Sequence, residues 1–187
     1  DASGVSGQYL HHIVSGRAPL GVSAGVRLAM SFAMCHRSLL VAKARYDAEV
    51  AARALGLGPA IEKIGSPLPT VLSIIAADEA SHQAVAMLKA QHLSARKAAI
   101  KAGLPPSRLA QVLSNRGLFS AGTAVSLAHV LGQPLDHFLV LQAASRADAE
   151  FGDLMRRQDI TPLPAAVRPS LRHGGSYAEL HIRNAKS

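Results

Sequence analysis

The stretch GLPPSRLAQVLSNR, residues 103–116, decides the fold that this sequence predicts. Gly103 can adopt the positive φ of a tight turn, and the two prolines that follow suit the first turn of a new helix. Leu109, Val112 and Leu113 then fall on one face of that helix, where they can contact a core. The stretch therefore predicts a turn followed by a short amphipathic helix.

Further helices are expected on both sides of this stretch. Ser94 and Ser120 suit N-cap positions, and Gly103 and Gly132 suit the ends of the helices that these serines begin. Ala, Leu and Val dominate the chain and aromatic residues make up only 4 %, a composition that favours helix over sheet. We expect an all-α fold with helices over 78–91, 95–102, 106–113, 121–131 and 135–155.

The spacing around the turn is typical of a helix-turn-helix. A small residue is required where the two helices cross, a residue that tolerates positive φ at the turn, and an apolar anchor in the second helix. Ala99, Gly103 and Leu109 meet these requirements. In a helix-turn-helix protein the second helix enters the major groove of DNA.

The opening stretch GVSGQYLHHIVSGR, residues 4–17, repeats this pattern 99 residues earlier. Gly4 aligns with Gly103 and Leu10 with Leu109, and the alignment continues without a gap over about 45 residues. The segments IEKIGSPLPTVLS (61–73) and RQDITPLPAAVRPS (157–170) share a Pro-Leu-Pro that cannot continue a helix. We expect a first, degenerate unit over 1–58, a Pro-containing linker over 59–77, a second unit over 78–158 and a basic tail over 159–187. Counterparts of the helices over 78–102 are missing from the first unit.

The second unit resembles the lambda-repressor-like (Xre) helix-turn-helix family, and its HigA-type antitoxin branch in particular. The resemblance is carried by Pro105 to Arg108, Thr123 to Ala128, Leu131-Gly132 and Leu141-Gln142, and it extends to 15–34 and 44–51 of the first unit. The first unit departs from the family pattern at Phe32-Ala33 and at Gly7. The resemblance implies two tandem helix-turn-helix units that bind operator DNA and regulate transcription.

Charge agrees with a polyanionic partner. The net charge is +8, and neither 2–46 nor 80–135 contains an acidic residue. Double-stranded DNA is the expected partner, because phosphate contacts require such cationic surfaces. A solvated basic surface without a nucleic-acid partner is the alternative.

The candidate DNA-contacting residues follow from the helix faces and the repeat. In the second unit they are Ser94, Arg96, Lys97, Pro106, Ser107, Arg108, Gln111, Asn115 and Arg116, and in the first unit Ser6, Gln8, Tyr9, His12 and Arg17. Arginine can pair with guanine and glutamine with adenine in the major groove, so Arg108 and Gln111 are the expected base-reading residues. His12 aligns with Gln111, whereas His11 is expected on the flank of its helix.

Other functional classes find little support in the sequence. No phosphate-binding loop or catalytic motif is present, so we expect neither an enzyme nor a cofactor. The adjacent pairs His11-His12 and Cys35-His36 cannot share a metal as residues four apart on a helix would, and Cys35 is expected to be buried. A homodimer, and a protein partner such as a toxin or the transcription machinery, both stay open, as does an antitoxin-type autorepressor that binds both DNA and a toxin.

The single cysteine and the lack of an apolar run of membrane-spanning length favour a cytoplasmic, nucleoid-associated protein. For the tail over 168–187, a short strand around Gly174-Gly175, a DNA-grasping arm and a contact for a protein partner are equally compatible with its composition.

Overall fold

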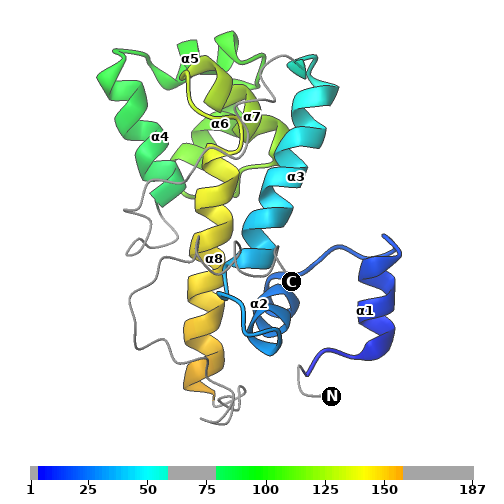
Figure 1. Ribbon diagram of the computed structural model, residues 1–187. Helices are drawn as coiled ribbons and strands as arrows, with labels where there is room; N and C mark the ends of the chain where they lie inside the picture. The colour runs from blue at the N-terminus through cyan, green and yellow to red at the C-terminus, as the bar shows by residue number, and fades with distance from the viewer. Residues whose placement is uncertain (1–3, 59–78, 158–187) are drawn as a thin grey trace, which may run out of the picture.

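The computed structural model describes residues 4–58 and 79–157, and every regular element in these two ranges is an α-helix (Figure 1). The all-α prediction is therefore confirmed for the described residues. The helices are α1 (Gly7–Val14), α2 (Val22–Ser31), α3 (Ser38–Ala54), α4 (Glu79–Ala90), α5 (Ala95–Lys101), α6 (Pro106–Leu113), α7 (Ala121–Val130) and α8 (His137–Arg156). The expected linker over 59–77 and the expected tail over 159–187 lie outside the described residues.

The helix ends follow the capping chemistry expected from the sequence. The Oγ of Ser94 accepts a hydrogen bond from the backbone N–H of Lys97, and the Oγ of Ser120 accepts one from Thr123, both at 3.3 Å. Gly103 and Gly132 have positive φ angles of 65° and 68° directly after α5 and α7. A residue without Cβ adopts this conformation at little cost, which is why these glycines end their helices.

Helix boundaries and turn conformations repeat along the chain. The starts of α1, α2 and α3 precede the starts of α6, α7 and α8 by 99 residues each. Positive φ angles occur at the same spacing, at Gly16 and Asn115 and again at Ala33 and Gly132. Ala33 therefore holds a conformation, with φ of 54°, that its counterpart Gly132 adopts without a side-chain penalty.

Hydrophobic packing joins the two halves of the chain. The long helices α3 and α8 lie side by side and run in opposite directions, α7 packs against α3, and α2 packs against α8 (Figure 1). The largest core cluster contains Ala44, Ala48 and Ala52 of α3 together with Leu127 of α7 and Phe138 of α8. The two expected units, which residues 59–77 separate in the sequence, thus share one hydrophobic core.

Polar contacts add to the pairing of α3 with α8. The guanidinium of Arg37 donates two hydrogen bonds to the carboxylate of Asp148, at 2.5 and 2.7 Å. The imidazole Nε2 of His36 lies 2.7 Å from the same carboxylate, and the ring stacks on Phe151 with 4.4 Å between ring centroids. Because Asp148 and Phe151 belong to α8, these contacts fix the loop before α3 against that helix.

Candidate nucleic-acid interface

Helices α5 and α6 are joined by a tight turn with a well-defined hydrogen-bond pattern. The N–H of Leu104 donates to the carbonyl of Ala99 at 2.8 Å, and the N–H of Gly103 donates to that of Ile100 at 3.1 Å. This is the Schellman pattern, which requires a left-handed residue at the position of Gly103. Ala99 and Leu109, the small residue and the apolar anchor of the expected motif, are both completely buried.

Helix α6 has one buried face and one exposed face. Leu109 and Val112 are buried and Leu113 is half-buried. The side chains expected to contact DNA are on the exposed face, at Pro106, Ser107, Arg108 and Gln111. The helix is thus anchored through one side while its first turns present polar groups to the solvent.

The loop after α6 extends this exposed surface. Asn115 adopts a positive φ of 60°, which asparagine tolerates better than most residues with a Cβ. The N–H of Arg116 donates to the carbonyl of Gln111 at 2.9 Å, and the side chain of Arg116 is exposed. This arrangement places Arg116 beside the end of α6.

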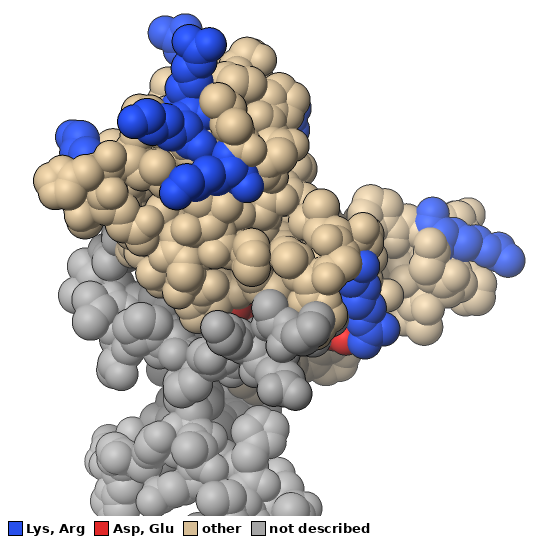
Figure 2. Space-filling view, turned by 90° about the horizontal axis from the view of Figure 1, so that it is seen from above, with Lys and Arg blue, Asp and Glu red and all other residues tan. Residues whose placement is uncertain are grey.

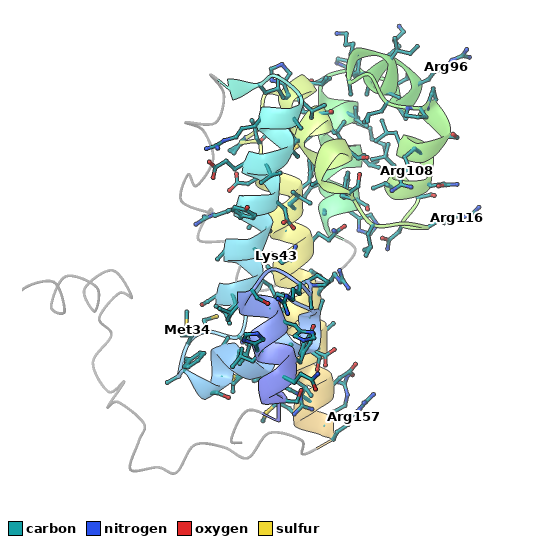
Figure 3. All side chains as sticks on the ribbon, turned by 90° about the vertical axis from the view of Figure 1, so that its right-hand side faces the viewer. Met34, Lys43, Arg96, Arg108, Arg116 and Arg157 are labelled. Atoms are coloured by element: carbon teal, nitrogen blue, oxygen red, sulfur yellow. The ribbon has the colours of Figure 1, made fainter. Side chains whose placement is uncertain are left out.

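Positive charge gathers at the α5–α6 end of the molecule. Figure 2, which looks onto this end, shows a group of Lys and Arg side chains at its upper left, and the acidic side chains visible in the view lie away from that group. Residues 80–135 contain no carboxylate, and their Lys and Arg side chains are all exposed, at Lys89, Arg96, Lys97, Lys101, Arg108 and Arg116. In Figure 3, Arg96, Arg108 and Arg116 project from the same side of the molecule. We call this set of six side chains the basic face.

Three residues that contribute to this surface were not among the expected DNA-contacting residues. Lys89 and Lys101 belong to the basic face, and only their positive charge indicated a role. Gln142 of α8 supports this surface indirectly, through two hydrogen bonds to the backbone of Phe119. Its amide oxygen accepts from the N–H of Phe119 at 2.8 Å, and its amide nitrogen donates to the carbonyl of Phe119 at 3.1 Å. Gln142 thereby holds the α6–α7 loop, a role that its place in the Leu-Gln motif did not reveal.

The candidate residues of the first unit are placed differently from their counterparts. Ser6 caps α1 by accepting a hydrogen bond from the N–H of Tyr9, and Gln8 and Arg17 are exposed. The hydroxyl of Tyr9 donates to the carbonyl of Pro19 at 3.0 Å and accepts from the N–H of Gly21 at 3.4 Å. Tyr9 therefore ties α1 to the next loop, whereas its repeat counterpart in α6 is an exposed arginine.

The two histidines of α1 reverse the expected order of exposure. His11 is exposed and His12 is half-buried, so His11 is the more accessible of the two. Their ring centroids lie 6.2 Å apart with the ring planes inclined at 59°. Among the described residues no group of three or more His, Cys, Asp or Glu side chains is arranged to hold a metal ion.

Cys35 is exposed, and the expectation that it is buried was wrong. It lies in the short loop between α2 and α3 rather than on an apolar helix face, which explains its exposure. No helix in the described ranges is long and apolar enough to cross a membrane.

Comparison with known proteins finds no matching family model, no matching curated protein and no matching solved structure. The role of the basic face is therefore inferred from its own residues.

Proposed function

We propose that this protein is a sequence-specific DNA-binding transcription regulator that inserts α6 into the major groove of double-stranded DNA. The observation that carries the proposal is the basic face, whose side chains come from the end of α4, from α5 and α6 and from the following loop, in a stretch without carboxylates. Each cation that meets a phosphate releases condensed counterions, which favours binding.

The exposed side of α6 has the chemistry needed to read bases. Recognition helices contact base edges through their N-terminal residues, and Ser107, Arg108 and Gln111 occupy that part of α6. Arginine can donate two hydrogen bonds to guanine, and glutamine can both donate to and accept from adenine. Because Leu109 and Val112 anchor the opposite face in the core, these side chains are presented from a rigid helix.

Arg96 and Lys97 at the start of α5 and Arg116 after α6 flank the reading helix. Side chains in such flanking positions contact phosphates and so fix the orientation of a protein on the duplex. This division of roles fits a helix-turn-helix of the lambda-repressor-like kind, with the HigA-type branch as the finer proposal. The proposal for α6 does not depend on base contacts by α1, because Tyr9 and His12 are less exposed than the α6 residues.

The test begins with selection of bound fragments from random double-stranded DNA, followed by affinity measurements on the selected site. Arg108→Ala is expected to weaken specific binding by about 5- to 150-fold, because a bidentate base contact contributes roughly 1–3 kcal/mol. Arg157→Ala is the matched control, since it removes one exposed arginine at the opposite end of α8 (Figure 3). Equal affinities for the two variants, or the absence of any selected sequence, would contradict the proposal.

The salt dependence separates phosphate from base contacts. Arg116→Ala is expected to reduce the slope of log affinity against log salt concentration by about 0.9, as expected for one lost phosphate contact. Gln111→Ala is expected to leave that slope unchanged while it relaxes the preference at one base pair. If Arg116→Ala leaves the slope of log affinity against log salt concentration unchanged, Arg116 does not contact a phosphate.

A further inference from the structure

The apolar face of α1 is far more exposed than the same face of its counterpart α6. Leu109 and Val112 of α6 are 0 % and 1 % exposed, whereas their counterparts Leu10 and Ile13 in α1 are only half-buried. Val14, at the end of α1, is 81 % exposed. The sequence conserves the apolar pattern of this helix between the two halves, and the described residues leave part of it uncovered.

Helix α3 shows the same difference from its counterpart α8. Leu141 and Ser145 of α8 are each 4 % exposed. The residues 99 positions earlier are Ala42, which is exposed, and Tyr46, which is 66 % exposed. The uncovered surfaces of α1 and α3 therefore correspond to surfaces that are buried on α6 and α8.

In the second half of the chain, two further helices, α4 and α5, pack beside α6. Helix α4 packs against α6 and α8, and α5 packs against α6 and α7. Figure 1 shows α4 and α5 grouped around α6 at one end of the α3–α8 pair, with α1 away from them. The described residues 4–58 supply no helices in the corresponding place beside α1.

The buried side chains of α4 and α5 show which residues a helix pair needs in order to pack on a surface of this kind. Ala80, Ala84 and Leu88 form a buried stripe at every fourth residue, and α5 adds the buried pair Ala98 and Ala99. Small side chains at this spacing let the helix axes approach closely, and the leucine fills the space at the end of the stripe.

Two polar side chains of α4 complete the fit by donating to backbone carbonyls. The Oγ of Ser81 donates to the carbonyl of Val112 at 2.8 Å, and the Nε2 of Gln91 donates to that of Leu131 at 3.1 Å. The carbonyls at the corresponding positions of the first half belong to Ile13 and Phe32. The apolar stripe and both acceptor positions thus recur in the first half.

We propose that the surface formed by Leu10, Ile13, Val14, Leu39, Ala42 and Tyr46, here called the α1–α3 face, is a docking site for a pair of helices of the α4–α5 kind. The occupant has Ala at two positions four residues apart, Leu four residues further on, Ser and Gln at the positions of Ser81 and Gln91, and a second short helix with two adjacent alanines. It comes from a polypeptide segment other than the eight described helices, because α4 and α5 are already packed on α6. This docking does not depend on the proposed DNA binding.

The experiment uses the full chain and a synthetic peptide with the sequence of residues 79–103. Hydrogen exchange is measured over 7–14 and 38–54, because α1 and the exposed side of α3 are the surfaces to be covered. Saturating peptide is expected to slow exchange in α1 by about tenfold or more. A peptide carrying Ala84→Asp and Leu88→Asp places charges in the stripe and is expected to give no protection.

A variant of the full chain shows where the peptide binds. Tyr46→Asp places a charge on the α1–α3 face at an exposed position and is expected to abolish the protection. Leu118→Asp is the control, since Leu118 is similarly exposed but lies in the α6–α7 loop. Loss of protection in both variants would contradict binding at the α1–α3 face.

In a second form of the experiment, the sequence of residues 79–103 is fused ahead of Val5. Docking is then intramolecular, so it can be detected even when the free peptide binds weakly. Protection of α1 in either form supports the proposal. Absence of protection in both forms overturns it. It is also overturned if α1 and α3 become protected as the concentration of the chain alone rises, because a second copy would then cover the face.

Discussion

Leucine-to-alanine substitutions at repeat-equivalent positions should cost very different amounts of stability. Leu109 is completely buried in the core, so Leu109→Ala loses the whole transfer free energy of the side chain and leaves a cavity. Such substitutions cost about 2–5 kcal/mol. Leu10 is only partly buried, so Leu10→Ala should lose a smaller transfer free energy and leave no enclosed cavity, which gives roughly 1–2 kcal/mol.

Urea unfolding followed by far-UV circular dichroism measures both costs. With an m-value of about 2 kcal/mol per molar urea, a loss of about 3 kcal/mol for Leu109→Ala lowers the midpoint by roughly 1.5 M. Leu10→Ala should lower the midpoint by only about 0.5–1 M, with m unchanged in both variants. Equal midpoints for Leu10→Ala and Leu109→Ala would show that α1 is as deeply buried in solution as α6, and would refute the difference between the two halves.

Three further outcomes follow from single residues. Ala33→Gly should stabilise the protein by about 1 kcal/mol in thermal melts, because it relieves a positive φ, and Gly132→Ala should destabilise it by a similar amount; changes of the same sign would contradict this. Asp148→Asn should cost about 1–2 kcal/mol by removing the charged acceptor of Arg37, and a double-mutant cycle with an Arg37 variant should return most of that cost as coupling. Burial lowers the pKa of His137 in the folded protein, partly offset by the adjacent carboxylate, so the unfolded chain binds its proton more tightly. The free energy of unfolding therefore does not depend on the titration of this histidine above about pH 6.5 and falls as the pH drops below that value. Between pH 7.5 and 5.5, the free energy of unfolding of His137→Gln should fall by less than that of the unmodified protein.

The helices could be predicted from the sequence because their signals are local. Ser94 and Ser120 cap helices from the adjoining residue, and Gly103 and Gly132 end them through their own backbone conformation. The turn between α5 and α6 followed from three residues for the same reason. These features depend on neighbours within one or two helical turns, which a single sequence displays directly.

Contacts between distant parts of the chain were not predicted. The pairing of α3 with α8 brings Arg37 to Asp148, and no local pattern indicates such a partner. The alanine stripe of α3, at Ala44, Ala48 and Ala52, was the available signal, since small residues four apart allow close helix packing. At the candidate site, the exposed face of α6 followed from helical periodicity, whereas the hydrogen bonds of Tyr9 depend on the path of the next loop.

The pairing of α3 with α8 has a consequence for synthesis of the chain on the ribosome. Helix α3 ends at Ala54 and α8 ends at Arg156, so about 100 residues must still be added before the partner of α3 is complete. At roughly 5–20 residues per second, this interval lasts about 5–20 s. During that time the apolar sides of α2 and α3 lack the surface that later buries them, and the nascent chain exposes the kind of surface that chaperones bind. The first half of this protein therefore completes its fold only when the second half arrives.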